Sequence, residues 1–297
     1  MKYTKPTLSF EQQADQLLNR GLQANRARLI ETLSRVNYYR LSAYWHSFKR
    51  PDESFVPGTT LEKVWRRYTF DRQLRLLVMD AIERVEVAVL RTLMVEHHAQ
   101  KYGPFGYRDA KNFRPEFAGL DHQRMVDEID QATNRSREPF VDQFRTKYYS
   151  EPGLPLWMAA EVASFGTQFT FYRHLHLPEQ KYLSSQLGLP ANVLQSWLLC
   201  LNYIRNLCAH HSRLWNRELG IRPLIPDRKN LPDWHLPVTP DNRRTFAVLT
   251  LLKWLLRQIA PQSQWTNRLR ELLKSYPDIP LNLAGFPPTW ETSPIWK

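Results

Sequence analysis

The stretch from Thr59 to His98 constrains the fold more than any other part of the chain, because its forty residues contain neither glycine nor proline. Apolar residues recur in it every three or four positions, as on the buried face of an amphipathic helix. These residues are Leu61, Val64, Trp65, Tyr68, Leu74, Leu77, Val78, Ala81, Ile82, Val85, Ala88, Val89 and Leu93. The pattern predicts one long scaffold helix that opens with a capping box between Thr59 and Glu62.

Shorter helices are predicted on both sides of this long one. Ser9 and Gln12 have the spacing of a capping box and Gly21 supplies a stop, which predicts a short helix from about 10 to 20. Apolar periodicity predicts further helical segments at 120–150, interrupted at Pro139, at 156–176, ended by Pro178, at 190–211, beginning with Pro190, and at 241–260. The predicted buried stripe of the 190–211 helix consists of Leu194, Trp197, Leu198, Leu201, Ile204 and Cys208.

The remaining segments show no alternating strand pattern. Residues 35–48, RVNYYRLSAYWHSF, are dense in aromatic side chains, which indicates core or helix packing rather than stacking on bases. Five prolines between 220 and 240 predict an extended loop, and a proline-rich tail begins at Pro277. We predict an all-α fold in three segments: a helical, aromatic-rich extension at 1–58, a helical core at 59–218, and at 219–297 a loop, a C-terminal helix and a tail packed on the core.

The charge balance favours a polyanionic partner. The chain has 41 Lys and Arg against 29 Asp and Glu, a formal net charge of +12, and such an excess attracts nucleic acid through counterion release. Cys200 and Cys208 form no CxxC pair, which indicates neither a disulfide framework nor a zinc knuckle. The first residues lack the order of a signal peptide and no long apolar run occurs, so we expect a cytoplasmic protein without membrane contact.

Common catalytic and metal-binding signatures are absent. The sequence contains no GxxxxGK[ST], GxGxxG, GxSxG or HExxH. The pairs His97–His98 and His174–His176 lack the four-residue spacing that places two imidazoles on one helix face. We therefore expect neither a metal site nor a cofactor.

The stretch 205–211, RNLCAHH, is the strongest candidate for a functional site, because it ends an apolar helix with polar and titratable side chains. On a straight α-helix Arg205 and His210 lie about 140° apart, whereas Asn206 and His210 share a face. Either the helix ends or bends between Arg205 and His210, or a second subunit completes the site. The structural alternative gives Arg205 a core hydrogen bond and makes His210 a cap of the helix end.

Arg205-Asn206, three residues and then His210 resemble the motif of HEPN ribonucleases, an arginine followed after four to six residues by a histidine. Three further blocks accompany the motif: CAHHSRLWNR at 208–217, RVNYYRLSAYWHSF at 35–48 and YTFDRQLRLLVMDAIERVEV at 68–87. Together they resemble the Abi-like family, abortive-infection proteins of the AbiD and AbiF type. The likeness runs from Phe10 to the helix near Leu255.

This resemblance implies a HEPN-like helical bundle with additional N- and C-terminal helices, and a role as a phage-defence protein or toxin. It implies RNA as the substrate, a homodimer with a composite site, and restraint by a structured noncoding RNA antitoxin, as in some relatives. HEPN toxins paired with a nucleotidyltransferase antitoxin usually carry tyrosine two positions after the motif histidine, and here that position is Ser212. Control by modification of such a tyrosine is therefore not expected.

The chemistry of RNA cleavage gives each residue of the motif a role. A ribonuclease that uses no metal needs a group that accepts the 2′-hydroxyl proton near neutral pH, and imidazole is the side chain that ionises in this range. We assign this general acid/base role to His210. Arg205 is assigned to the charge that grows on the phosphate oxygens. Asn206 is expected to orient His210 or to hold a phosphate oxygen.

Supporting roles are assigned to five further residues. Contacts with backbone phosphates are expected from His211, Arg213 and Arg217. Glu83 and Glu86, both on the long helix, are expected to pair with Arg205 or to hold the tautomer of His210, and a surface or helix-stabilising role is the alternative. Two other functions stay open at this point. One is a noncatalytic RNA-binding or protein-interaction module of a defence system, and the other is DNA binding, for which no helix-turn-helix pattern stands out.

Overall fold

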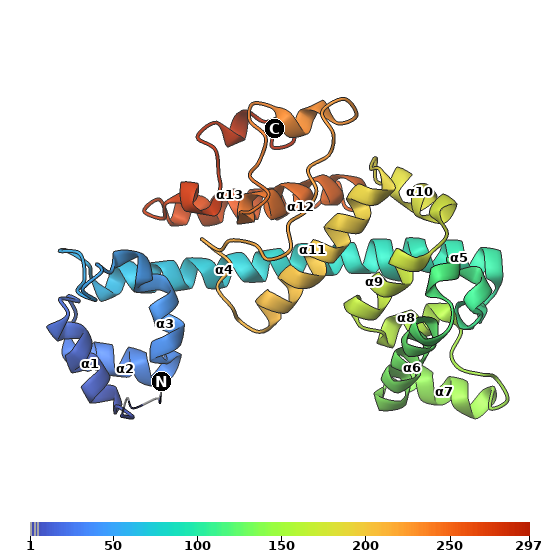
Figure 1. Cartoon of the computed structure of the whole chain (residues 1–297), viewed down its shortest axis with the longest axis horizontal. Coiled ribbons are helices and arrows are strands. Elements are labelled where there is room, and N and C mark those ends of the chain that lie inside the picture. The colour runs from blue at the N-terminus through green and yellow to red at the C-terminus, as the bar shows by residue number, and fades with distance from the viewer. Residues whose placement is uncertain (1, 3, 5) are drawn as a thin grey trace. The chain divides into compact units, whose positions relative to one another are not determined.

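The computed structural model describes residue 2, residue 4 and residues 6–297 (Figure 1). Within these residues no strand forms, and β-type pairing is confined to two isolated bridges, so the predicted all-α fold is confirmed. The α-helices are α1 (Phe10–Asn19), α2 (Arg26–Val36), α3 (Tyr38–Trp45), α4 (Leu61–Val85), α5 (Met94–Tyr102), α6 (Leu120–Arg135), α7 (Pro139–Lys147), α8 (Leu156–Val162), α9 (Phe165–His174), α10 (Leu177–Ser185), α11 (Ala191–Ala209), α12 (Thr245–Ile259) and α13 (Trp265–Ser275). A π-helix, η2 (Glu86–Leu93), joins α4 to α5, and the short 3-10 helices are η1 (His46–Phe48), η3 (Gly106–Arg108), η4 (Ala110–Asn112), η5 (Pro115–Phe117), η6 (Pro232–His235), η7 (Leu281–Ala284) and η8 (Trp290–Thr292).

Contacts divide the chain into two compact units. One unit holds the residues up to Leu76 together with Leu269–Pro280, and the other holds Leu77–Arg268 with Leu281–Lys297. Both α4 and α13 contribute residues to each unit. The division into three segments at 58 and 218 is not tested by this partition and stays a prediction.

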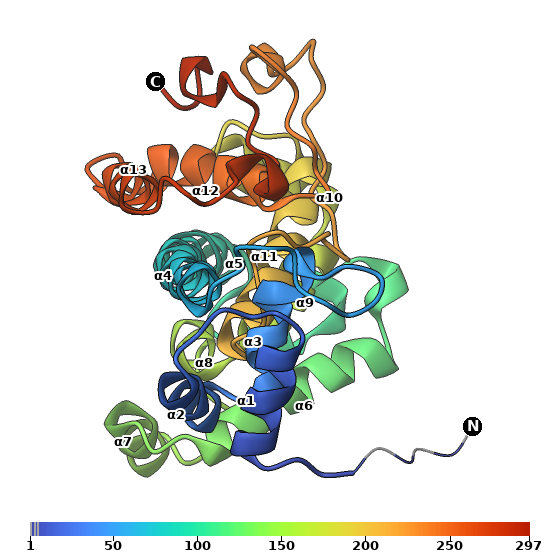
Figure 2. The ribbon, with the colours of Figure 1, turned by 90° about the vertical axis from the view of Figure 1, so that its left-hand side faces the viewer.

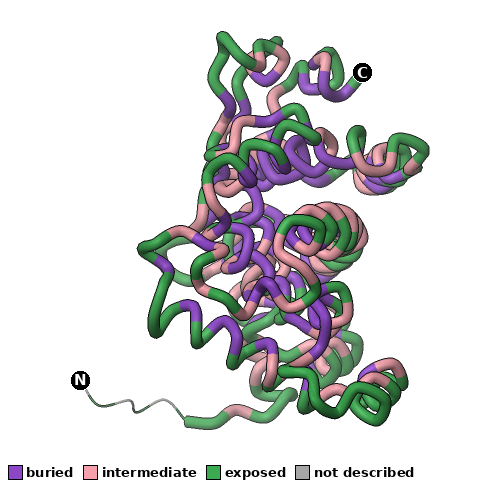
Figure 3. The backbone as a smooth tube through the Cα atoms, turned by 90° about the vertical axis from the view of Figure 1, so that its right-hand side faces the viewer, coloured by how far each residue is buried: buried purple, intermediate pink, exposed green. Residues whose placement is uncertain are grey.

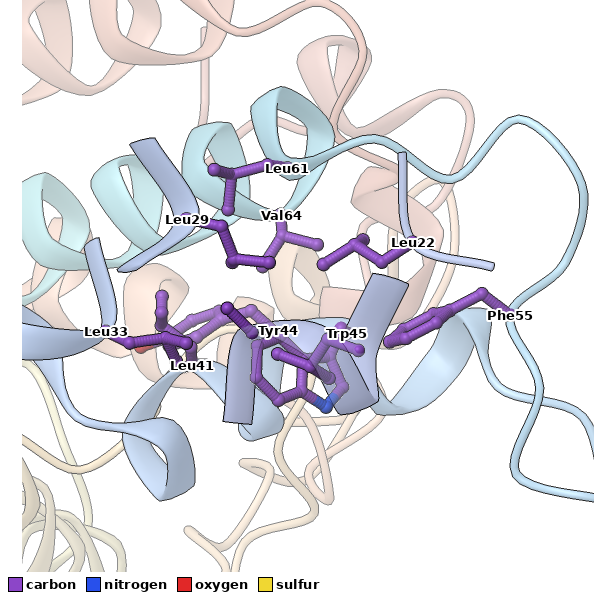
Figure 4. Close-up of a cluster of buried hydrophobic side chains, with 11 residues drawn as sticks. Leu22, Leu29, Leu33, Leu41, Tyr44, Trp45, Phe55, Leu61 and Val64 are labelled. Carbon is purple, nitrogen blue, oxygen red and sulfur yellow. The ribbon is translucent and has the colours of Figure 1, made fainter. Parts of the chain in front are cut away.

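The first unit is built on a core of apolar side chains from α1, α2, α3 and the first turns of α4. Figure 4 shows this cluster, in which Leu29, Leu41 and Val64 are fully buried. Trp45 packs edge-to-face on Phe55 with ring centroids 6.2 Å apart. The predicted packing role of the aromatic stretch therefore holds for Tyr44 and Trp45, which are 2% and 1% exposed, but not for Tyr39, which is 77% exposed.

Helix ends in this unit follow local sequence rules. The predicted capping box of α1 is present, since Gln12 N donates to Ser9 Oγ at 3.3 Å and Ser9 N donates to Gln12 Oε1 at 2.9 Å. The predicted box between Thr59 and Glu62 is wrong. Thr59 donates its hydroxyl to the carbonyl of Val56, and the cap of α4 is Thr60, whose hydroxyl oxygen accepts from Lys63 N at 3.2 Å.

A buried ionic group lies beside this core. Asp71 of α4 is fully buried and forms an ion pair with Arg75 one turn later. Tyr44 of α3 donates its hydroxyl to the same carboxylate at 2.6 Å. A buried charge is stable only when it is paired and hydrogen-bonded, so this group ties α3 to α4 at one position.

The predicted long helix continues without a break from Leu61 to Tyr102, but its middle is π-helical rather than α-helical. In a π-helix the backbone bonds join residues five apart, which brings side chains at positions i and i+5 together. Glu86 and Arg91 use this spacing, with 2.7 Å between the carboxylate and the guanidinium. The KYGPFGY break is confirmed, since α5 ends before Gly103, whose φ is +79°.

Two predicted helices of the second unit have different boundaries in the structure. The 120–150 segment forms α6 and α7, with Pro139 as the first residue of α7, as expected. The single helix predicted over 156–176 is instead two helices, because Ser164 caps a new helix by accepting from Thr167 N at 3.1 Å. Pro178 lies in the first turn of α10 rather than ending a helix. The sequence prediction also lacked α13.

The predicted helix after Pro190 is α11, and all six residues of its predicted stripe are buried. It packs against α9 and α10 (Figure 2). The predicted extended loop then runs back along it, because Trp197 Nε1 donates to the carbonyl of Leu224 at 2.8 Å and Gly220 N donates to the Tyr203 hydroxyl at 3.3 Å. Buried residues recur on the inner sides of the helices, as the alternation of purple and green in Figure 3 shows.

Among the described residues, no helix has the length and apolar character needed to cross a membrane.

Candidate active site at the end of α11

The helix that carries the candidate site ends in a Schellman turn. Ser212 N donates to the carbonyl of Leu207 at 2.9 Å, and His211 N donates to the carbonyl of Cys208 at 3.0 Å. This turn requires a left-handed residue at its fifth position, and here that residue is His211, with a φ of +57°. The same pair of bonds ends α1, where Gly21 takes the left-handed position. A histidine accepts this conformation less readily than glycine, so the backbone at the candidate site is strained.

The three residues of the motif lie on the last two turns of α11. Arg205 is half-buried and donates to Asn206 Oδ1 at 3.4 Å, while Asn206 and His210 are exposed. The helix continues through Ala209 to its cap at His210, so it neither ends nor bends between Arg205 and His210. In the described part of the chain no hydrogen bond joins these two side chains. A single copy of α11 therefore does not bring them together.

The arginines that follow the helix lie on an anchored turn. Leu214 is buried, and its carbonyl accepts from the hydroxyl of Thr245 at the start of α12, at 2.9 Å. Arg213 and Arg217 are half-buried, and Arg217 Nε donates to the carbonyl of Arg213 at 2.7 Å. Asn216 has a φ of +53°, which curls the chain back. The two guanidinium groups are thus presented by a fixed turn directly after the candidate catalytic histidine.

The start of α9 lies beside α11, one turn before the motif. A Cβ added to Gly166 would lie 3.8 Å from Nδ2 of Asn202 and 3.6 Å from the Ser164 hydroxyl oxygen. Asn202 is four residues before Asn206, so both amides face the same side of α11. Asn202 was not among the predicted site residues. Its signal in the sequence, an amide one turn before the motif, has meaning only once the start of α9 is known to lie there.

Glu86 is directed to Arg91 rather than to the motif. Arg91 donates to the carbonyls of Ala160 and Glu161 at 2.8 and 2.6 Å, both in the last turn of α8. Glu86 thus orients a guanidinium that holds the turn from α8 into α9. Glu83 is exposed on α4, and in the described residues no bond or ion pair links it or Glu86 to Arg205 or His210.

The other histidine pairs take part in aromatic packing. The ring of His97 stacks on Tyr182 with centroids 4.4 Å apart, and the ring of His174 stacks on Phe117 at 3.8 Å. His98 is fully buried, and this burial lowers its pKa to about 4. Over the part of the chain that the structure describes, no group of three or more His, Cys, Asp or Glu is placed to hold a metal ion.

Comparison with known proteins assigns the chain to a family. The model of the Abi-like protein family matches residues 31–216, which is more than half of the chain. The chain belongs to the Abi-like family. No curated protein and no solved structure matches it.

Membership of the Abi-like family points to abortive infection, a form of phage defence. The Abi-like match covers the Tyr44–Asp71–Arg75 group of the first unit and all of α11 in the second. It ends at Asn216, so the Schellman turn and Arg213 fall inside the Abi-like stretch and Arg217 falls just outside it. Apart from Arg217, the candidate site therefore lies within the stretch that the family model matches.

Proposed function

We propose that this protein is a phage-defence or toxin-type endoribonuclease that works without a metal ion, with its active site at the end of α11. The observation that carries the proposal is the exposed imidazole of His210 at the cap of α11. Arg205 and Asn206 lie within the two preceding turns, in a protein with a net charge of +12. The family match supports the phage-defence setting.

The proposed reaction is an internal transesterification of RNA. The 2′-oxygen attacks the adjacent phosphorus, its proton passes to His210, and the bond from phosphorus to the 5′-oxygen breaks. Negative charge grows on the nonbridging oxygens, where the guanidinium of Arg205 stabilises it. The products are a 2′,3′-cyclic phosphate and a 5′-hydroxyl, and the 5′-oxygen must receive a proton as it leaves.

A two-fold dimer would supply the missing geometry. A continuous helix separates Arg205 from His210 by about 140°, and a symmetric pairing of two α11 ends places the residues of one chain opposite those of its partner. In each centre His210 of one chain then takes the 2′-proton beside the partner's Arg205, and the 5′-oxygen receives its proton from water. Restraint by a structured noncoding RNA is part of the same proposal, because the basic turn after His210 offers its guanidinium groups to phosphates.

The test is to incubate the purified protein with a mixed RNA pool in EDTA and to sequence and chemically type the new ends. We expect cleavage that leaves 5′-hydroxyl ends and is lost in His210→Ala and in Arg205→Ala. The matched control is His46→Ala, which removes an exposed histidine of the other unit and should change nothing. Cleavage that leaves 5′-phosphates and vanishes in EDTA contradicts the mechanism. Unchanged cell toxicity of the His210→Ala variant favours a noncatalytic binding module instead.

A further inference from the structure

A cavity of about 370 Å³ lies in the second unit, away from the motif in sequence, between α6, α7 and the segment that follows α7. α6, α7 and α8 lie together in Figure 1. The volume is within the range of sites that hold a small molecule or one unit of a polymer. The cavity therefore has room for a ligand of that size.

Aromatic side chains form one side of the cavity. Phe144 and Tyr148 pack on each other with ring centroids 4.9 Å apart. Tyr149 follows directly and is 88% exposed. A tyrosine ring that is exposed at the edge of a cavity offers a flat apolar face, and such faces are where unpaired bases stack.

Another part of the cavity lining is polar and is held in place by other contacts. Asp130 accepts two bonds from Arg108, both at 2.8 Å. Gly153 lies against the same guanidinium, since a Cβ added to it would be 2.7 Å from Nη1 of Arg108. Tyr107 donates its hydroxyl to the carbonyl of Leu154 at 2.9 Å. This wall is fixed by bonds within the protein, so the ligand meets a preformed site.

Charged groups at the cavity differ in how far they are engaged. Arg145 lines the cavity and donates to Asn134 Oδ1 at 2.5 Å, which keeps its guanidinium at the edge. Lys147 is not part of the lining, but its ammonium lies 5.2 Å from the centre of the Tyr148 ring, which is. Glu151 also lines the cavity and is exposed. Cations beside an aromatic face fit a phosphate next to a base, and a carboxylate fits the N–H groups of the base edge.

We propose that this cavity binds one nucleotide, with its base on Tyr149, the base edge toward Glu151 and its phosphate at Arg145 and Lys147. The nucleotide is either an unstacked residue of an RNA chain or a free mononucleotide, and both present this chemistry. Where the nucleotide belongs to RNA, the site rests on the proposed function. It then holds the substrate at a nucleotide distant from the bond that is cleaved.

The experiment uses the full-length chain with His210→Ala, which removes the proposed general base. One arm measures the affinity of a fluorescein-labelled single-stranded RNA of mixed sequence by anisotropy. The other measures binding of each ribonucleoside 5′-monophosphate by saturation-transfer NMR. In each arm Tyr149→Ala is compared with Tyr149→Phe, which keeps the ring, and with Tyr39→Ala, which removes another highly exposed tyrosine, 77% against 88%.

We expect Tyr149→Ala to weaken binding about tenfold, the usual effect of losing one base–aromatic stack, and the other two variants to bind as the parent does. A loss in the RNA arm assigns the site to RNA, and a loss confined to the mononucleotide arm assigns it to a free nucleotide. The proposal is overturned if Tyr149→Ala binds as tightly as the parent protein in both arms, or if no binding is detected in either arm. RNA cleavage by the wild-type protein with unchanged affinities overturns this site and leaves the proposed function intact. A tenfold loss of affinity in a protein that never cleaves RNA supports the nucleotide site and overturns the proposed function.

Discussion

Glu86 and Arg91 form an ion pair 2.7 Å long across five positions of one helix, and only the π-helical segment between α4 and α5 makes that pair possible. Arg91 uses Nη1 to donate to the carbonyls of Ala160 and Glu161 in the last turn of α8. Glu86 was expected to pair with Arg205 or to hold the tautomer of His210. It pairs instead with Arg91, the residue that holds the turn between α8 and α9.

Removing this carboxylate should destabilise the protein. Both partners are mostly buried, with side chains 15% and 17% exposed, so Glu86→Gln leaves the Arg91 guanidinium with only the 54% exposed Glu161 carboxylate, 3.3 Å away, as a counter-charge. We expect the free energy of unfolding to fall by about 1–3 kcal/mol in chemical denaturation. The matched control is Glu83→Gln on the exposed side of the same helix, which should change stability by less than about 0.5 kcal/mol. Equal effects of the two changes would show that the Glu86–Arg91 pair is not stabilising.

The left-handed residue of the Schellman turn can be tested by substitution. His211→Val places a β-branched side chain at a φ of +57°, whereas His211→Asn places one that tolerates this region. Both variants lose the imidazole, so their difference isolates the backbone. We expect the valine variant to be less stable than the asparagine variant by about 1–2 kcal/mol in thermal or denaturant unfolding. Equal stability would mean that the turn relaxes to another conformation.

The buried imidazole of His98 should make stability depend on acid. Its pKa is lowered to about 4 by burial, so the folded state keeps it neutral while the unfolded chain takes up a proton below about pH 6.5. The free energy of unfolding is therefore not reduced by His98 above pH 6.5, and it falls as the pH drops from 6.5 toward 4. We expect this loss to be about 2–4 kcal/mol, measured as urea unfolding at several pH values. His98→Phe, which keeps the aromatic packing, should remove this part of the acid dependence; an unchanged pH profile would contradict the assignment.

Mixing two inactive chains tests the composite site. Arg205→Ala and His210→Ala are each expected to be inactive alone. If every active centre combines Arg205 of one chain with His210 of its partner, an equal mixture after subunit exchange should recover about a quarter of the wild-type cleavage rate, because half of the dimers have one intact centre. A mixture as inactive as its parents, or full activity of the wild type at dilutions where only monomer is present, would contradict the shared centre.

The turn after α11 should set the salt dependence of RNA binding. We expect Arg213→Gln and Arg217→Gln each to lower the magnitude of the slope of log affinity against log salt by about 0.7–0.9, the effect of one lost phosphate contact. The control is Arg124→Gln, an exposed arginine paired with Asp121. If the slope is unchanged in all three variants, phosphate contacts lie elsewhere.

Local signals were enough to predict much of the fold. Ser9 and Gln12 specify the start of α1 because both bonds of a capping box form within four residues. Gly21 marks its end because glycine readily takes the left-handed position of the closing turn. Ser164 starts α9 by a single side-chain cap, yet the apolar pattern runs on across it and predicts one helix. At α4 two adjacent threonines offered alternative caps, and the choice of Thr60 depends on backbone geometry that residue types do not reveal.

The candidate site was predictable as a set of residue types but not as an arrangement. Arg205 and His210 were selected because they resemble the HEPN motif, and their catalytic roles stay a prediction. His211 gives no sign of its left-handed backbone, since the position usually belongs to glycine. The role of Glu86 depends on a π-helical spacing that no glycine or proline announces, and Asn202 depends on contact with a helix start almost forty residues earlier.

The bonds that run from α11 to the segment after it extend beyond the stretch that the family model matches. The family match stops at Asn216, yet the carbonyl of Leu224 is what satisfies the buried indole of Trp197. A fragment trimmed to the matched stretch would open one side of α11 to water, and the strained turn that presents His210 would lose its anchor at Thr245. The stretch that matches the family model is therefore not a self-sufficient folding unit in this protein. We expect limited proteolysis to release a fragment that extends beyond Asn216 and not one that ends there.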